Sequence, residues 1–411
     1  MRFSVKRRWV ILALLFAASV INYVDRQTLS ILARRIQDDL QMTELDYTRV
    51  VQLFLAAYTI GFLISGWLTD KLGERRGLTL FIAWWSMANI LTGLVRSTGA
   101  LGAARFMLGL GEAGLYTVAP KVVGRLFPPA QRGIAVGIYS TGATIGATLA
   151  PPLIAAVALQ YGWRSAFVVG GLAGLLWLVP WLLLYRVPQT PAATADPALP
   201  PPIPTNWRDI VFCRAALLLM GVRILTDPVW QFILFWFPKY LQDAHDMSLG
   251  TLGRVTWIVY LAADVGGIAV GFASGGLVRR GLRAADAHKW VLTACAAIIP
   301  CCAVVPLLPS NAMIIAVMAL VALLVFAFMV TLTALAVEVL PHDRIGSTFG
   351  IVAAGSGIGG ILFSQAVGHL VTSFSYTPVF LLMACLHPLS LLLVWRAARE
   401  GRRKPALPPI Q

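Results

Sequence analysis

Two pairs of charged residues interrupt apolar stretches of the sequence. Asp25 and Arg26 are adjacent and follow the apolar run Trp9–Ile21, and a second pair, Arg105 and Glu112, lies in ARFMLGLGEAGLY. A charge at the centre of a bilayer costs at least ~2.5–3.5 kcal/mol on insertion scales, so charges inside such runs indicate function. An arginine can hold a carboxylate through two parallel hydrogen bonds, and a carboxylic acid in a low-dielectric cavity favours its neutral, protonated form. Two arginines with two titratable acids predict a site that moves an anion together with protons.

Helical geometry separates the members of the first pair. Adjacent side chains diverge by about 100° around a helix, so Asp25 and Arg26 cannot simply neutralise each other, and each needs another partner. Asn22 and Tyr23 precede Arg26 by four and three residues and share its face. The arginine and glutamate of the second pair are two turns, or about 10 Å, apart on one face. A structural network of four charges that stabilises the N-terminal helices is the alternative interpretation.

The composition is that of an integral membrane protein. Hydrophobic residues make up 58% of the 411 residues and charged residues 12%, against about 45–50% and about 25% in soluble chains. The alternation typical of a membrane barrel is missing, so we expect an all-α membrane protein. Twelve predicted transmembrane helices lie at roughly 9–33, 48–69, 77–96, 100–124, 132–157, 163–186, 209–241, 248–277, 288–308, 311–339, 345–372 and 376–397.

The formal net charge of +15 indicates topology. Most of the 33 Lys and Arg residues fall in alternate loops, and the positive-inside rule then places both termini in the cytoplasm. We therefore expect no nucleic-acid partner. The five cysteines lie in or beside the predicted spans without a CxxC pair, which predicts neither disulfides nor metal ligands.

A proline-rich segment divides the chain into two halves. The predicted linker, 187–207, separates an N-terminal six-helix bundle (1–186) from a C-terminal one (208–398), and a basic cytoplasmic tail follows at 399–411. The halves echo each other, since LFPPAQRGIAVGI and LPHDRIGSTFGI each carry an arginine, Arg132 and Arg344, three residues after a proline. Two related bundles are typical of a transporter.

The stretch GWLTDKLGERRG (Gly66 to Gly77) resembles the signature loop of the major facilitator superfamily. The resemblance covers essentially the whole chain and implies that superfamily's fold of two pseudo-symmetric six-helix bundles. In the second copy Gly275 stands where the first has Asp70. Ordinary retention of basic residues in the cytosol is the alternative to a charge latch between access states. The resemblance and the internal echo give the predicted gating residues Asp70, Arg75, Arg76, Arg132 and Arg344.

Within the superfamily, INYVDRQTLSI and RFMLGLGEAG are similar to the anion:cation symporter family. TDPVWQFILFWFPKYL and AAGSGIGGILFSQAVGHLV look like its bacterial hexuronate and aldonate members. The resemblance implies proton coupling by Asp25 and Glu112, with Arg105 paired to the coupling acid. It also implies that Arg26 binds the substrate carboxylate and that Tyr23 and Tyr58 line the sugar-acid site.

One stretch departs from the family pattern. After GEAG, relatives usually continue with Asn, an aromatic residue and Pro, whereas this chain has Leu115, Tyr116 and Thr117. The coupling chemistry is unaffected, but the identity of the substrate is left open. The residues expected to bind its hydroxyl groups are Asn22, Gln231, Ser356 and Ser364.

Other intramembrane charges have less definite roles. Arg223 and Asp227 are spaced i, i+4 beside Pro228, which fits an internal salt bridge at a kink and a substrate or gating role equally well. Asp264 is expected to pair with another helix. Two GxGxxG stretches lie inside apolar runs without a preceding strand, so neither predicts a dinucleotide site. With no catalytic motif, metal cluster or cofactor motif, we expect a protein that is not an enzyme and that uses an ion gradient.

The sequence thus predicts a proton-coupled importer of sugar-acid anions that works by alternating access. A hexuronate, such as glucuronate or galacturonate, or an aldonate is the expected substrate. We expect a monomer embedded in the lipid of a bacterial inner membrane, with small organic anions and protons as its partners. The alternatives are another organic-anion carrier, either a monocarboxylate carrier or an exchanger, and a sensor that has lost transport.

Overall fold

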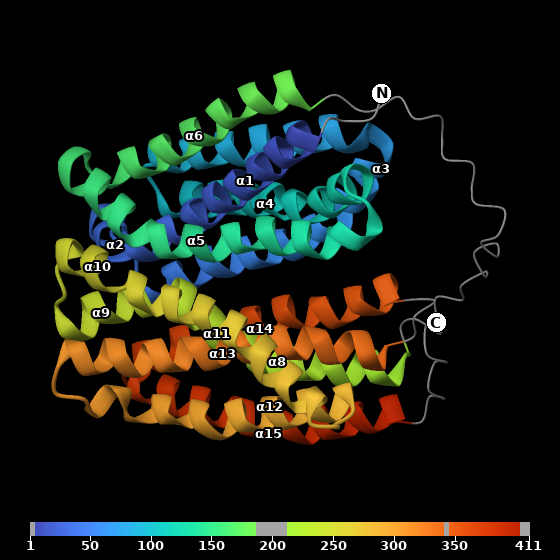
Figure 1. Ribbon diagram of the computed structural model, residues 1–411. Helices are drawn as coiled ribbons and strands as arrows, with labels where there is room; N and C mark the ends of the chain where they lie inside the picture. The colour runs from blue at the N-terminus through green and yellow to red at the C-terminus, as the bar shows by residue number, and fades with distance from the viewer. Residues whose placement is uncertain (1–4, 186–211, 341–344, 403–411) are drawn as a thin grey trace. The chain divides into compact units, whose positions relative to one another are not determined.

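The computed structural model describes residues 5–185, 212–340 and 345–402 (Figure 1). These residues form fourteen α-helices and one 3₁₀ helix and contain no strand, which confirms the predicted all-α class for this part of the chain. The linker predicted at 187–207, Arg344 and most of the predicted basic tail lie outside the described residues.

The described residues form two compact units. Unit 1 takes the described residues of Met1–Pro201 together with Leu234–Leu261, and unit 2 takes those of Pro202–Ile233 and Ala262–Gln411. Division into bundles at 1–186 and 208–398 stays a prediction. The first six helices are α1 (Val5–Ile31), α2 (Ala33–Leu40), α3 (Glu44–Leu94), α4 (Thr98–Leu126), α5 (Pro129–Tyr161) and α6 (Trp163–Leu184). The later ones are α8 (Arg214–Phe235), α9 (Phe237–His245), α10 (Leu249–Val255), α11 (Trp257–Arg279), α12 (Ala284–Ile298), η1 (Ile299–Leu307), α13 (Asn311–Val339), α14 (Ile345–Ser373) and α15 (Thr377–Arg402).

Ten helical segments in the described residues are long and apolar enough to cross a membrane. The predicted spans 48–69 and 77–96 share one helix, α3, whose backbone turns at Gly73 (φ 75°). Glycine adopts this left-handed conformation without the steric cost of a Cβ. The predicted span 100–124 lies in α4, which is 29 residues long but is not among the ten. Twelve spans therefore stay a prediction.

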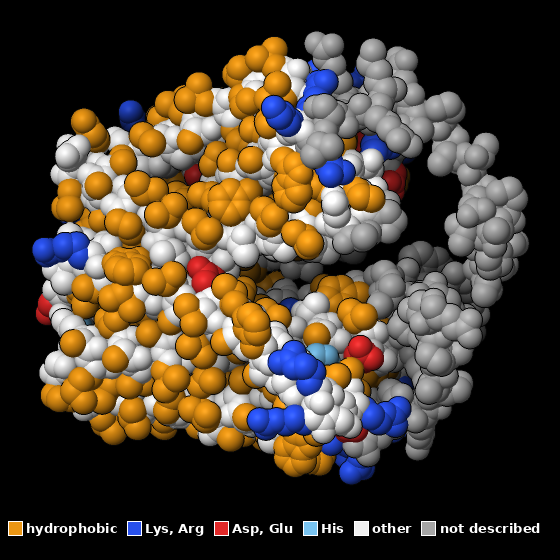
Figure 2. Space-filling view, viewed as in Figure 1, with side chains coloured by type: hydrophobic (Ala, Val, Ile, Leu, Met, Phe, Trp, Pro, Cys, Tyr) orange, Lys and Arg blue, Asp and Glu red, His pale blue; other side chains and the backbone are white. Residues whose placement is uncertain are grey.

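The outer surfaces of the helices are apolar, as lipid contact requires. Leu176 on α6, Phe272 on α11 and Leu392 on α15 are each about 70% exposed. Hydrophobic side chains cover most of the visible face of both units in Figure 2. Contiguous exposed apolar surface on this scale is rare in soluble monomers and marks contact with another apolar phase.

Glycines bring the helices of unit 1 into close contact. A Cβ built on Gly109 of α4 would lie 2.5 Å from the Phe54 carbonyl oxygen of α3, and one on Gly146 of α5 would lie 2.5 Å from the Val20 carbonyl oxygen of α1. Gly109, which lies between Arg105 and Glu112 in sequence, thus serves helix packing. This close approach positions the polar face of α4.

Gly109→Ala tests this packing. The added methyl group has no space against Phe54, and overpacking of this kind costs about 1–3 kcal/mol, so we expect a lower melting temperature for the purified protein. Gly124→Ala in the same helix is the control, because a Cβ at Gly124 meets no atom within 4 Å. Equal melting temperatures for the two variants would contradict the packing role of Gly109.

Candidate functional site

A buried ion pair joins α1 to α4 in unit 1. Arg26 donates to the same oxygen of Glu112 twice, from Nε at 3.0 Å and from Nη2 at 2.9 Å. Arg26 is 7% exposed and Glu112 is fully buried. Asn22, one turn before Arg26, accepts from its Nη2 at 3.4 Å. Charge-assisted hydrogen bonds of this length are among the strongest in proteins.

Aromatic rings surround the Arg26 guanidinium. Its central carbon lies 4.7 Å from the ring centre of Tyr23, 4.4 Å from that of Tyr58 and 5.6 Å from that of Phe54. Each separation is within the range of cation–π attraction, which is stronger where water is excluded. The predicted substrate residues Asn22, Tyr23, Arg26 and Tyr58 therefore form one cluster in this unit.

Asp25 has different partners from its neighbour. Its Oδ1 accepts from the amide nitrogen of Asn89 on α3 at 2.8 Å, and the carboxyl group is fully buried. Gly170 of α6 makes room for it, since a Cβ there would lie 2.3 Å from Oδ1. Asp25 thus bonds α3 and lies against α6, whereas Arg26 forms its ion pair with α4.

Arg105 is fully buried beneath α1. Its guanidinium donates to the backbone carbonyls of Asp25 at 3.5 Å and Arg26 at 3.3 Å, and it lies 5.0 Å from the ring centre of Phe54. It makes no ion pair within the described residues, where the carboxylate of Glu112 pairs with Arg26 instead. Arg105 therefore holds the polar end of α1 through the backbone.

The four charged side chains form a balanced buried site. It contains two guanidinium groups and two carboxyl groups, and each of the four residues is at most 7% exposed. One oxygen of each acid, Oδ2 of Asp25 and Oε1 of Glu112, has no hydrogen-bond partner among the residues that the structure describes. Each acid can therefore take a proton on an oxygen that no other group occupies.

Unit 2 contains two smaller polar groups. Gln231 of α8 donates to the backbone carbonyl of Ser356 on α14 at 3.0 Å, and its Oε1 is buried without a partner in the described part of the chain. Ser364, also on α14, is 2% exposed. Arg223 bonds Asp227 at 2.9 Å and Thr333 of α13 at 2.9 Å, so the internal salt bridge, one of the two predicted alternatives, is present.

The predicted signature loop crosses the turn at Gly73 and pairs with α4. Asp70 pairs with Lys121, and Glu74 pairs with Arg125 at 3.1 Å. Arg75 donates to the carbonyl of Leu182 on α6 at 2.6 Å. These contacts tie α3 to α4 and α6 within unit 1. Of the other predicted gating residues, Arg76 is exposed, Arg132 lies in α5 and Arg344 lies outside the described residues.

The sequence matches a known family of membrane proteins over most of its length. The model of the Major Facilitator Superfamily matches residues 15–364 and 287–410. The chain belongs to the Major Facilitator Superfamily.

Relatives and solved structures of this superfamily cover nearly the whole chain. The hexuronate transporter of Escherichia coli K12 is 25% identical over 97% of this chain and 95% of its own length. The D-galactonate transporter of Escherichia coli O6:H1 is 27% identical over 93% of each chain. A crystal structure of a D-xylose-proton symporter superposes with a TM-score of 0.78 at 14% identity, over 97% of this chain and 99% of the other, which shows the shared fold. These relatives are transporters by name, and none is named as an enzyme.

Three residues beside the charged site were not predicted from the sequence. Asn89 binds Asp25, Phe54 lies against both arginines, and the fully buried amide of Gln27 has no hydrogen-bond partner among the described residues. A neutral amide inside a predicted span is the signal that could have identified Asn89 and Gln27. Phe54 gives no such signal, because a phenylalanine in an apolar run is ordinary.

Lys239 of α9 was also missed, because it lies near the end of the predicted span 209–241 and was not among the predicted site residues. Its side chain is 1% exposed, bonds Glu44 of α3 at 2.8 Å, and also pairs with Asp243. Nearby, the Tyr47 hydroxyl donates to the Phe235 carbonyl at 2.6 Å. The segment Leu234–Leu261 is thereby attached to α3 within unit 1.

Arg26→Met tests the ion pair as a stabilising element. Loss of the guanidinium leaves Glu112 buried without a cation, and breaking a buried pair in this way costs about 3–5 kcal/mol. We expect a marked fall in melting temperature, part of which the double variant Arg26→Met/Glu112→Gln recovers. A double variant less stable than Arg26→Met would contradict this account of the pair.

Proposed function

We propose that this protein is a proton-coupled symporter that imports sugar-acid anions into the cell. The named relatives support the substrate class, since two of them are a hexuronate transporter and a D-galactonate transporter. A hexuronate such as glucuronate or galacturonate, or an aldonate, carries one carboxylate and several hydroxyl groups. Proton coupling and alternating access are common in the superfamily.

The bond from Arg26 to Glu112 is the observation that carries this proposal. Arg26 uses two nitrogens on a single oxygen of Glu112, a geometry that a substrate carboxylate could take over. Protonation of Glu112 removes its negative charge and weakens its hold on the guanidinium. A substrate carboxylate then competes successfully for Arg26, so proton binding favours anion binding.

Charge balance extends this coupling to Asp25. With both acids ionised, the site of Asp25, Arg26, Arg105 and Glu112 has no net charge. Each proton that it takes adds one positive charge to a buried region, where electrostatic attraction is stronger than in water. An anion restores the balance, so protons and substrate bind together and leave together.

We assign recognition of the substrate's hydroxyl groups to neutral polar side chains. In unit 1, Asn22, Tyr23 and Tyr58 surround Arg26, and Gln27 follows it in α1. A buried amide without a partner is costly, and a hydroxyl group would satisfy it. In unit 2 we assign the same role to Gln231, Ser356 and Ser364. The Oε1 of Gln231 is the acceptor available there.

We propose a location in a bacterial inner membrane with both termini in the cytoplasm. The alternating distribution of Lys and Arg along the sequence supports this orientation. The signature loop with Asp70, Arg75 and Arg76 then lies on the cytoplasmic side. We propose that its ion pairs with α4 change as access alternates.

Glu112→Gln separates binding from proton coupling. We expect proteoliposomes with this variant to exchange labelled glucuronate for internal glucuronate, because the amide, like the protonated acid, leaves Arg26 available. They should lose accumulation driven by an inward proton gradient, because glutamine cannot take the proton. Uptake and exchange of labelled substrate measure the two activities.

Asp38→Asn is the control and should keep gradient-driven accumulation, because the Asp38 side chain is exposed on α2 and pairs with no cation within the described residues. Gradient-driven accumulation by Glu112→Gln would refute its coupling role. If galacturonate and galactonate fail to compete with glucuronate, or if uptake requires an internal counter-anion, the proposed function as a sugar-acid symporter is wrong. An organic-anion exchanger or monocarboxylate carrier would then be the better assignment.

The attachment of the segment Leu234–Leu261 to α1–α3 is a candidate gate on the external side. Ser30 of α1 donates to the Leu234 carbonyl at 2.8 Å, and Gln242 donates to the Ile31 carbonyl at 3.1 Å. Lys239 supplies the positive charge of this contact, because it pairs with two carboxylates, those of Glu44 and Asp243. In the proposed orientation, opening toward the outside requires these bonds to break.

Lys239→Gln should therefore favour the outward-open state. Without the ammonium group, Glu44 and Asp243 repel each other across the contact. We expect Ser30→Cys, in a background without the native cysteines, to react several-fold faster with an external membrane-impermeant maleimide when Lys239→Gln is added. Arg254→Gln is the control, because among the described residues the side chain of Arg254 bonds only within α10. An unchanged rate would contradict the gate.

A further inference from the structure

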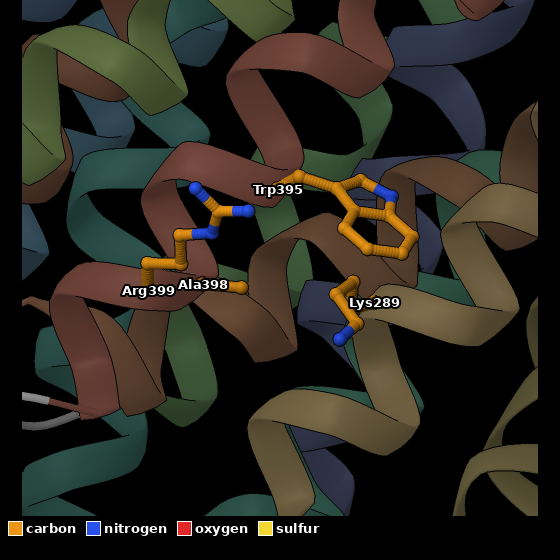
Figure 3. Close-up of a pocket in the computed structure, with 4 residues that line it drawn as sticks. All are labelled: Lys289, Trp395, Ala398 and Arg399. Atoms are coloured by element: carbon orange, nitrogen blue, oxygen red, sulfur yellow. The ribbon is translucent and has the colours of Figure 1, made fainter.

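A small basic pocket opens at one end of unit 2. Lys289 of α12 and Trp395, Ala398 and Arg399 of α15 line it (Figure 3). Its cavity volume is about 90 Å³. Since a single water needs only about 10–15 Å³, the pocket has room for a larger polar group, such as a phosphate.

Lys289 supplies a buried positive charge to this pocket. Its side chain is 10% exposed, and its ammonium nitrogen lies 4.5 Å from the ring centre of Trp395 and 5.3 Å from that of Trp290. Asp286, one turn earlier, accepts from it at 3.1 Å. The indole nitrogen of Trp395 donates to Thr293 at 3.2 Å, which fixes the ring beside the ammonium group.

Arg399 supplies the second positive charge. It is exposed and has no ion pair or hydrogen bond within the described residues, unlike Lys289. Lys289, Arg399 and Asp286 together leave a net charge of one positive unit at the pocket. A guanidinium group matches the planar oxygen pair of a phosphate, and a neighbouring ammonium group adds a point charge.

The surroundings of the pocket match a membrane interface. Trp290 is 49% exposed and contacts Trp395 edge to face at 5.5 Å, while Leu389 and Leu392 on α15 are 56% and 69% exposed. Lys and Arg side chains gather at this end of unit 2 in Figure 2. Exposed tryptophans and leucines beside basic residues are typical of the level at which lipid headgroups meet acyl chains.

We propose that this pocket binds the phosphate group of an anionic phospholipid. Arg399 and Lys289 hold the phosphate, Trp395 packs beside it, and the acyl chains follow the exposed leucines of α15. Basic pockets between transmembrane helices bind anionic headgroups in this way. A soluble phosphate ion would use the same two cations but would gain nothing from the apolar surface, so we assign the site to lipid. The inference does not depend on which substrate is transported.

Native mass spectrometry of the full chain in detergent, titrated with phosphatidylglycerol, tests the site. We expect Arg399→Gln to weaken binding of the first phosphatidylglycerol several-fold. Arg280→Gln, which removes an exposed charge at the end of α11 outside the pocket, should leave that affinity unchanged. Phosphatidylcholine, whose headgroup has no net charge, should bind more weakly than phosphatidylglycerol and should respond equally to both variants.

Three results would overturn the proposal. Equal weakening by Arg399→Gln and Arg280→Gln would show general attraction to a basic surface rather than a pocket. Competition by inorganic phosphate at the same concentration as the lipid would assign the site to a soluble anion. Finally, Arg399→Gln and Lys289→Gln could both bind phosphatidylglycerol as the parent does and melt at the parent's temperature. That result would show that the pocket binds no headgroup.

Discussion

The arrangement of the helices in unit 1 depends on the ion pair between Arg26 and Glu112. A guanidinium and a carboxylate removed from water must each have a partner, because an unpaired buried charge costs several kcal/mol. α1 and α4 each contribute one arginine and one acid to this region, and the contacts of Arg26, Glu112 and Arg105 hold the two helices together. Asn89 on α3 and the space at Gly170 on α6 then complete the surroundings of Asp25.

Phe54 shows how the site keeps two like charges near each other. Its ring centre lies 5.6 Å from the guanidinium carbon of Arg26 and 5.0 Å from that of Arg105. One aromatic ring therefore attracts both cations. The close packing at Gly109 makes this arrangement possible, because it brings the backbone of α3 at Phe54 against α4.

Much of this site was predictable from residue types and helical spacing. Charges inside apolar runs identified Asp25, Arg26, Arg105 and Glu112, and the 100° step between neighbours predicted separate partners for the first two. Which arginine bonds Glu112 was not predictable from spacing, because it depends on the rotation of α1 relative to α4. Residues two turns apart on one helix are too distant to bond directly, so Glu112 needed a partner from another helix.

The fold, too, was predictable from the sequence only in part. The all-helical class follows from composition and apolar segments, whereas nothing in the sequence singled out Lys239, near the end of the predicted span 209–241, as a buried ion-pair partner. A lysine after an apolar run looks solvated in sequence, and only tertiary contacts with Glu44 and Asp243 reveal that it is enclosed. The same applies to Phe54, whose importance comes from its two neighbours rather than from its type.

The two units distribute their charges in different ways, despite the echo between the sequence halves. In unit 2, Arg223 and Asp227 neutralise each other within one turn of α8, so their bond can persist while α8 moves as a rigid element. In unit 1, the Arg26–Glu112 bond joins two helices, so a change in the protonation of Glu112 alters the force between α1 and α4. This difference supports our proposal that proton coupling belongs to unit 1 and that neutral groups of unit 2, such as Gln231, recognise hydroxyls.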